Sequence, residues 1–111
     1  MLIAIVQIPG VKRSEADAIA AARGTAPTYT DMPGLKRKYY LNGDAGGGGV
    51  YLWESREAAE AWYDEGWADR MEERFGARPT LTYYENHVVV DNDAGEVRVN
   101  GRAEPRDTAA E

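Results

Sequence analysis

Apolar runs separated by turn-forming residues predict four β-strands along this chain. The first is Leu2–Ile8, an uninterrupted apolar run that ends at a Pro-Gly pair, as is typical of a buried strand. Three further runs, rich in β-branched and aromatic residues, cover residues 35–41, 50–54 and 80–91. The run at 50–54 carries bulky side chains at odd and even positions, so we expect both of its faces to be covered.

The segment after the first strand has the spacing of an amphipathic helix. Ser14 is a suitable N-cap, and apolar positions recur at helical spacing as far as Tyr29. Gly24 and Pro27 interrupt this stripe. We therefore expect a helix, a break, and a further turn that restarts near Thr25 rather than one straight helix.

A second helical segment follows Ser55, which is again a suitable N-cap. Its apolar positions recur every four residues from Ala59 to Phe75, whereas a helix has about 3.6 residues per turn. The stripe therefore drifts by about 40° at each step, too far for one straight helix to keep it on a sheet. Gly66 lies within the segment, so we predict two helical pieces that meet there.

Four consecutive glycines, Gly46–Gly49, come directly before the strand at 50–54. A phosphate-binding loop places its glycines between a strand and the helix that follows, which is the opposite order. We therefore interpret residues 42–49 as a hairpin turn, which makes the strands at 35–41 and 50–54 antiparallel.

The order strand, helix, strand, strand, helix, strand predicts an α+β protein with a ferredoxin-like, split βαββαβ antiparallel sheet and helices on one face. The other face would expose tyrosine and aliphatic side chains, a large apolar patch for a monomer. A second copy would cover it, so we expect a homodimer of the dimeric α/β-barrel type. In this prediction residues 1–92 form a single domain and 93–111 form a polar tail, with a short extra strand near 96–100 and disorder from residue 102 onward.

Charge and composition narrow the possible partners. The formal net charge is −6, which argues against nucleic acid and anionic membranes, because phosphate binding needs basic patches. The absence of cysteine excludes disulfides and thiolate metal sites, and a single histidine without a dinucleotide fingerprint gives no support for a metal, haem or flavin. We therefore expect no cofactor. The first apolar run is too short for a membrane span and lacks a basic flank, so we expect a cytoplasmic protein.

Two signatures in the middle of the chain resemble those of the YdhR-like monooxygenases. One is PGLKRKYYL at Pro33–Leu41 and the other is GGVYLWES at Gly48–Ser55, within an ordered run of matches from Ala26 to Asn92. This family belongs to the dimeric α/β-barrel group that includes the antibiotic-biosynthesis monooxygenases. The resemblance implies the ferredoxin-like fold, a dimer, and a pocket between each sheet and its helices, and it implies monooxygenase activity by analogy of fold.

Two positions depart from the pattern of these relatives. His87 stands where the YdhR-like pattern has a proline, which makes His87 a poor candidate for shared chemistry. Trp62 stands close to where related quinone-forming monooxygenases often have a histidine on the second helix. An indole cannot transfer a proton as an imidazole does, so the mechanism of those enzymes does not carry over directly.

Aromatic residues form the main candidate site. They would line a pocket for a flat hydrophobic molecule, with tyrosine hydroxyls orienting its polar edges. The alternative is ordinary core packing and dimer contact. The predicted pocket residues are Tyr29, Trp53, Trp62, Tyr63, Trp67 and Tyr84.

Lys38 and Tyr40 are the predicted catalytic pair. They share a strand face with Lys36, and a buried Lys38 would bind an anionic or enolate oxygen. The alternative for Lys38 is a solvated or salt-bridged side chain. His87 is a further candidate as a general base, against the alternative of a partly exposed strand histidine. The acidic residues within 64–73 have no spacing specific to hydrolysis or metal binding and indicate a solvated helix face.

These features favour a cofactor-independent monooxygenase, or a related small-molecule enzyme, that acts on an aromatic or polyketide-like substrate. Such chemistry deprotonates the substrate, whose carbanion then reduces oxygen, and it needs a dry pocket, a base and a site for the developing oxyanion. The alternative is a noncatalytic dimeric protein that binds a ligand or assists a stress response. A third possibility is a dimeric scaffold whose pocket is vestigial.

Overall fold

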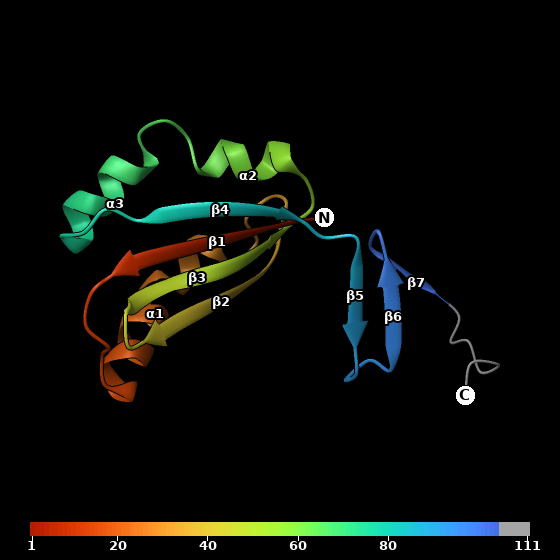
Figure 1. Ribbon diagram of the computed structural model, residues 1–111, viewed down its shortest axis with the longest axis horizontal. Helices are drawn as coiled ribbons and strands as arrows, with labels where there is room; N and C mark the ends of the chain where they lie inside the picture. Colours follow the sequence, from red (N-terminus) through yellow and green to blue (C-terminus); the bar gives the residue numbers. More distant parts are fainter. Residues whose placement is uncertain (105–111) are drawn as a thin grey trace.

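A four-stranded antiparallel sheet forms the body of the computed structural model, which describes residues 1–104. Its strands are β1 (Leu2–Pro9), β2 (Leu35–Gly43), β3 (Gly46–Trp53) and β4 (Thr80–Glu85), in the spatial order β2-β3-β1-β4 (Figure 1). All neighbouring strands in this sheet run antiparallel. With its helices, the sheet has the predicted α+β, ferredoxin-like βαββαβ topology, which is confirmed.

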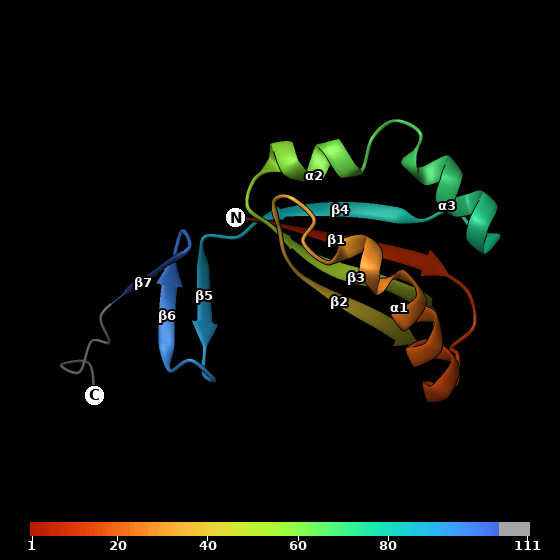
Figure 2. The same ribbon diagram turned by 180° about the vertical axis from the view of Figure 1, so that it is seen from behind.

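Three helices cover one face of this sheet. Helix α1 (Glu15–Tyr29) connects β1 to β2, while α2 (Arg56–Trp62) and α3 (Trp67–Phe75) connect β3 to β4. Figure 2 shows α1 in front of the β1, β3 and β2 strands, with α2 and α3 along the β4 side. The second helical segment is divided as predicted, because α2 ends at Trp62 and Gly66 is the N-cap position of α3. Among the described residues, no helix combines the length and apolarity that a membrane span requires.

The residues that face the helices alternate along β1 and β3. Ala4 and Trp53 are completely buried, with 0% of their surface exposed. Burying these apolar side chains is the main favourable contribution to folding, at about 25 cal/mol for each Å² removed from water. The buried core residues are Leu2, Ala4, Val6, Tyr51, Trp53, Ala59, Tyr63 and Trp67.

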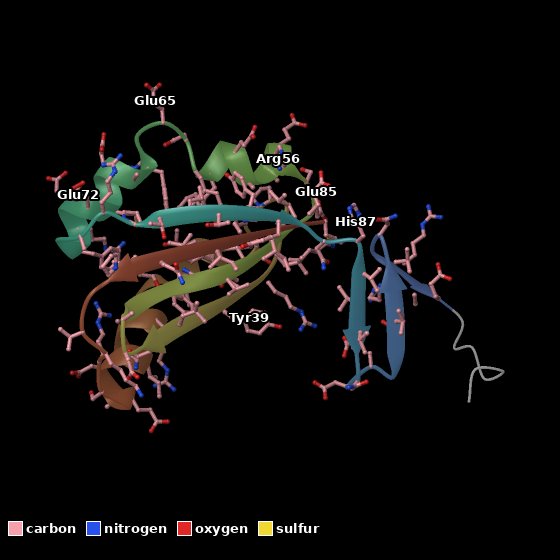
Figure 3. All side chains as sticks on the ribbon, viewed as in Figure 1. Tyr39, Arg56, Glu65, Glu72, Glu85 and His87 are labelled. Carbon is pink, nitrogen blue, oxygen red and sulfur yellow. The ribbon has the colours of Figure 1, made fainter. Side chains whose placement is uncertain are left out.

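The opposite face of the sheet is uncovered in the single chain. Tyr39, Leu41 and Tyr84 lie there with 54%, 40% and 55% of their surfaces exposed. The register explains their position, because Tyr84 pairs with Ile3 and Tyr39 pairs with Val50, which alternate with the helix-facing residues of β1 and β3. Figure 3 shows Tyr39 beside β2 on this open side.

Helix α1 is continuous, so the predicted break near Thr25 is wrong. The helix runs through Gly24 and Pro27 and ends at Tyr29. Pro27 stands close to the C-terminal end, where the loss of its single N–H costs one intrahelical hydrogen bond and does not stop several following turns. The N–H of Thr30 bonds to the carbonyl of Ala26, which closes the last turn beyond the proline.

The glycines before residue 50 belong to β3, so their interpretation as a turn is wrong. The turn between β2 and β3 is only Asp44-Ala45, and Gly46–Gly49 pair with β1 and β2 on both sides. Gly46 and Gly48 have φ angles of +131° and +141°, and a Cβ at either position would run into a carbonyl oxygen of β1. Glycine is therefore required here by the close approach of two backbones rather than by a turn.

A second, three-stranded antiparallel sheet follows the first in the chain. Its strands are β5 (Val88–Asp91), β6 (Glu96–Val99) and β7 (Arg102–Glu104). The predicted single strand at 80–91 is therefore wrong, because it divides at Asn86-His87, where the Asn86 N–H bonds to the carbonyl of Met1 at 2.9 Å. Figures 1 and 2 show the second sheet projecting beyond one end of the first.

The second sheet changes the prediction for the tail. The short extra strand expected near 96–100 corresponds in position to β6, but residues 102–104 are a strand where disorder was expected. Residues 105–111, the rest of that predicted disordered segment, lie outside the described residues. The pairing of β7 with β6 satisfies backbone groups that a free tail would leave to water.

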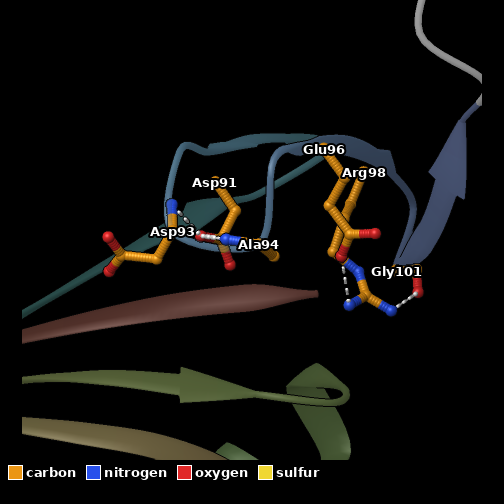
Figure 4. Close-up of polar contacts among 6 residues, drawn as sticks. All are labelled: Asp91, Asp93, Ala94, Glu96, Arg98 and Gly101. Carbon is orange, nitrogen blue, oxygen red and sulfur yellow. Dashed lines mark hydrogen bonds and ion pairs between the residues drawn. The ribbon is translucent and has the colours of Figure 1, made fainter.

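Side-chain hydrogen bonds hold the turns of the second sheet. The Asp91 carboxylate accepts from the backbone N–H groups of Asp93 and Ala94, at 3.1 and 3.0 Å (Figure 4). This arrangement is the side-chain-to-backbone bonding that favours aspartate in turns. At the other end, the Arg98 guanidinium donates to the Glu96 carboxylate at 3.1 Å and to the Gly101 carbonyl at 3.2 Å.

Candidate functional site

A cavity of about 660 Å³ lies between α1, α3 and the helix-facing side of the sheet. This volume is within the range of typical small-molecule sites. Its inner wall contains Tyr29, Lys38, Tyr51 and Trp67, and Met71 continues the apolar surface along α3. Exposed residues from the β1–α1 loop, the end of β2 and the end of α3 also line it, and we call this solvent-facing part its mouth.

Small residues explain why this space is open. Helix α1 presents alanines toward the cavity, among them Ala18 and Ala22, and none of its residues is buried. Gly47 lies opposite on β3, where the register places it beside the helix-facing Ile8. With a glycine on the sheet and alanines on α1, the space between them is left unfilled. By contrast, Tyr63 at the C-cap of α2 and Trp67 of α3 fill the core.

Lys38 lies against three tyrosine rings inside the cavity. Its Nζ atom is 3.5 Å from the ring centre of Tyr29, 4.0 Å from that of Tyr40 and 4.8 Å from that of Tyr51. The side-chain stem passes over Gly49, where a Cβ would lie 3.3 Å from Lys38 Cε. Ring faces at these distances attract an ammonium group.

The environment of Lys38 lowers its basicity. Burial lowers the pKa of Lys38 to about 7, and the positive charge of Arg74 contributes in the same direction. None of the salt bridges found in residues 1–104 involves Lys38. The neutral amine and the ammonium are therefore both accessible near neutral pH, and the ring faces favour the charged form.

A β-bulge separates Lys38 from Lys36. The register of β2 against β3 shifts between Leu35 and Arg37, so Leu35 and Lys38 both face the helices. Strict alternation from residue 35 to 41 was therefore a wrong prediction for the start of this strand. Lys36 is exposed and forms a salt bridge to Glu54 at 3.1 Å, outside the cavity.

Tyr40 connects β2 to α1 beside Lys38. Its hydroxyl is 2.9 Å from the Thr25 hydroxyl, and either group can donate. Tyr29 packs edge-on against Tyr40, with ring centres 6.4 Å apart, and burial raises the pKa of Tyr29. The two predicted catalytic residues, Lys38 and Tyr40, thus lie in contact with each other and with the cavity.

The six predicted pocket residues fall into three groups. Tyr29 and Trp67 line the cavity. Trp53 and Tyr63 lie in the core behind it, where the indole N–H of Trp53 donates to the Tyr63 hydroxyl at 3.3 Å, and burial raises the pKa of Tyr63. Trp62 and Tyr84 make up the third group, and neither lines the cavity.

Trp62 and Tyr84 lie apart from the cavity for different reasons. Trp62 packs edge-on against Tyr29, with ring centres 5.5 Å apart, and its buried indole N–H has no partner in the described part of the chain. Tyr84 is on the open face of the sheet. Pairing with β1 places Tyr83, not Tyr84, on the helix-facing side.

Several cavity residues were not among those predicted from the sequence. Tyr51 shares its strand face with Trp53, so the period-two pattern contained the signal for it. Arg13, Asn42 and Arg74 come from a loop, a strand end and a helix end, and no local pattern links them. Asn42 holds the loop in place, since its amide accepts from the Arg13 N–H at 3.0 Å and donates to the Arg13 carbonyl at 2.9 Å.

The remaining candidates lie elsewhere. His87 is at the junction between the two sheets, 3.3 Å from Asn100 and 3.6 Å from Glu85 (Figure 3). Glu65 and Glu72 project from the outer side of the α2–α3 segment. Within residues 1–104, no group of three or more histidine or acidic side chains is placed to hold a metal ion.

Comparison with known proteins agrees with this fold. No protein family profile and no curated protein matches the sequence. Among solved structures, the chain is similar to a monooxygenase from the gene ActVA-Orf6 of Streptomyces coelicolor in complex with nanaomycin D, with a TM-score of 0.56, 16% identity, and coverage of 81% of this chain and 90% of that one. It is also similar to a variant of SnoaB, a cofactor-independent oxygenase from Streptomyces nogalater, with a TM-score of 0.53, 14% identity, and coverage of 80% and 96%.

These likenesses define the class of fold. The chain shares the α+β fold of these two proteins, with a four-stranded antiparallel sheet and helices. At such low identity the similarity shows the fold alone. The narrower resemblance to YdhR-like proteins stays a prediction.

Proposed function

We propose that this protein is a cofactor-independent monooxygenase of an aromatic or polyketide-like molecule, which it binds in the cavity between α1, α3 and the sheet. The observation that carries the proposal is the Lys38 amine, placed inside an aromatic cavity without a carboxylate partner among the described residues. Such an amine is available to take a proton from a bound molecule.

Lys38 and Tyr40 have distinct roles in this reaction. The neutral amine of Lys38 takes a proton from an acidic C–H of the substrate and becomes an ammonium, which the tyrosine ring faces stabilise. The Tyr40 hydroxyl donates a hydrogen bond to the enolate oxygen as its charge develops. The carbanion transfers electrons to dioxygen and forms a C–O bond, and a CH₂ group with one O₂ becomes a C=O group with release of one water.

The structural relatives support the choice of substrate class. One is a monooxygenase in complex with nanaomycin D, and the other is a cofactor-independent oxygenase. The same cavity suits a flat ligand here, since aromatic side chains from α1, the sheet and α3 surround it. We include the chain in the YdhR-like branch of this fold on its two sequence signatures.

The protein in this proposal is a homodimer. The open face of the sheet exposes Tyr39, Leu41 and Tyr84, a surface that a second sheet would cover. The second sheet exposes valines as well, with Val88 and Val90 at 54% and 67%. Burying both surfaces against a second copy removes apolar side chains from water.

A noncatalytic ligand-binding protein is the second candidate function. The cavity and its rings serve binding whether or not Lys38 moves a proton. The indole N–H of Trp62, which stands near the histidine position of related enzymes, cannot act as their base. Binding without turnover would favour this candidate.

Oxygen consumption tests the two candidates. The probe is anthrone, a tricyclic ketone with an acidic CH₂ group, and the assay follows oxygen uptake and quinone formation without added metal or flavin. We expect turnover by the wild-type protein and a loss of about 100-fold or more in Lys38→Met. If anthrone binds but its oxidation is no faster than in the protein-free reaction, the monooxygenase function is contradicted and the ligand-binding function is supported.

A further inference from the structure

All the charged side chains that line the cavity among residues 1–104 are positive. Arg13, Lys38 and Arg74 contribute to its walls and mouth, and no aspartate or glutamate does so among residues 1–104. The chain as a whole is acidic, with 19 acidic and 13 basic residues. A cavity without a carboxylate in so acidic a chain therefore differs from the rest of the surface in the sign of its charge.

The three cations are not neutralised within the described chain. None of them takes part in a salt bridge there, although Arg70 and Arg78 near Arg74 are both paired with acidic side chains. Arg74 instead lies over the Phe75 ring, with 5.2 Å from Cζ to the ring centre. Its position in the last turn of α3 is favourable for a cation, and its guanidinium forms no salt bridge within residues 1–104.

The positions of these cations are set by the fold. Lys38 is held among three rings and lines the same cavity as Arg74, whose positive charge lowers the pKa of Lys38. The backbone of Arg13 is held at the mouth by paired hydrogen bonds to the Asn42 side chain. The repulsion between like charges that face the same cavity decreases when an anion binds there.

From this juxtaposition we infer that the cavity selects aromatic ligands that carry an acidic group, a carboxylate or an ionised phenol, which lies toward Arg74 and Arg13 while the rings pack against Tyr29, Tyr51 and Trp67. The inference rests on the proposed function in taking this cavity as the ligand site. It adds the charge of the ligand, which neither the fold nor the comparisons specify. Guanidinium groups bind carboxylates with charge-assisted and often bidentate hydrogen bonds.

A pair of nearly isosteric probes tests the inference. The probes are 2-naphthoate, an anion at neutral pH, and 2-naphthamide, which is neutral and has the same shape. Their dissociation constants are measured by calorimetry and by tryptophan fluorescence at low and high salt. We expect 2-naphthoate to bind about 10-fold more tightly at low salt, with a smaller difference at high salt.

Charge-removing variants assign the preference to particular residues. Arg74→Gln and Arg13→Gln are expected to reduce the preference for 2-naphthoate, and the double variant to abolish it. Arg23→Gln is the matched control, because Arg23 is an exposed arginine of α1 that does not line the cavity. Circular dichroism checks that each variant is folded, which is expected because these arginines are exposed.

Each outcome decides the inference. Equal binding of both probes, or a preference that survives in the double variant, would overturn it while leaving the cavity as a ligand site. Failure of both probes to bind would overturn it together with the assignment of the cavity. A preference for 2-naphthoate that depends on Arg74, in a protein that does not oxidise anthrone, would support the inference and contradict the proposed monooxygenase function.

Discussion

The amine of Lys38 lies 3.5 Å from the ring centre of Tyr29. The two residues come from β2 and from the last residue of α1, so this contact forms only when the helix returns to the sheet. It gives Lys38 an aromatic and partly dehydrated environment, which lowers its pKa to about 7.

The first prediction concerns pH and turnover. Because the pKa of Lys38 is lowered to about 7 by burial, the neutral amine gains population as the pH rises through that value. We expect kcat/KM for anthrone to rise with pH and level off above a midpoint of about 7. Lys38→Arg keeps the charge but cannot release its proton, so its turnover is expected to be low and without this midpoint. A wild-type midpoint retained in Lys38→Arg would contradict the role of Lys38.

The second prediction concerns pH and stability. The pKa of Lys38 lies near 7 in the folded protein and at its ordinary value of 10.5 when unfolded, so between these values the unfolded chain binds the extra proton. Stability linked to Lys38 is therefore lowest near and below pH 7 and recovers as the pH rises toward 10.5. Urea unfolding of wild type and Lys38→Met at several pH values measures this. Between pH 7 and 10.5, the free energy of unfolding of the wild type should rise relative to that of Lys38→Met. A difference between the two proteins that stays constant with pH would contradict this prediction.

The third prediction concerns the core under the cavity. Trp53 is 0% exposed and donates a hydrogen bond to Tyr63, so Trp53→Ala leaves a large space and an unpaired hydroxyl. We expect a loss of about 3–5 kcal/mol in the free energy of unfolding, measured by denaturant titration. Val11→Ala is the control, because Val11 is 89% exposed and should change stability by less than about 0.5 kcal/mol. Similar values for the two variants would show that Trp53 is not a core residue.

The fourth prediction concerns the glycines of β3. Gly48 has a φ of +141°, and a Cβ there would run into the Val6 carbonyl, so Gly48→Ala must displace β1 or β3. We expect a clear decrease in melting temperature, corresponding to at least about 1–3 kcal/mol. Gly10→Ala is the matched control, since a Cβ at Gly10 meets nothing within 4 Å. Equal melting temperatures for Gly48→Ala and Gly10→Ala would disprove the close approach of β1 and β3.

The fifth prediction concerns the open face of the sheet. Tyr84 is 55% exposed there, on the side opposite the cavity. Tyr84→Lys should weaken self-association measured by sedimentation, because it places a charge in the proposed apolar contact, and should leave 2-naphthoate binding unchanged. Ala61→Lys, at an exposed position of α2 that does not line the cavity, should change neither. Sedimentation of the wild-type protein as a monomer would contradict the proposed dimer.

Particular residues show what local patterns can predict. Ser14 and Ser55 were recognised as helix caps, and both side chains accept the expected backbone hydrogen bond, from Asp17 and Ala58. The drift of the stripe from Ala59 to Phe75 predicted a division at Gly66. These features depend on neighbours in the chain, and so a single sequence is enough to find them.

Other residues were misplaced because distant partners decide their positions. Gly46–Gly49 resembled a turn, but their need for glycine comes from the carbonyls of β1. Tyr84 and Trp53 resembled a single aromatic set, although the register of β4 against β1 places Tyr84 on the open face. A shift of one residue would exchange these faces, and the sequence of one strand does not specify its pairing.

By itself, the sequence determined the order of the strands and helices of the first sheet, the α+β class and the choice of Lys38, Tyr40 and the tryptophans as the residues of interest. The tertiary structure alone decided which face of the sheet meets the helices and which aromatics line the cavity. It also brought Arg13 and Arg74 to the same space as Lys38. The reason is physical: caps and periodicity are local properties of the chain, whereas burial, pKa and charge in a cavity depend on groups that only folding brings together.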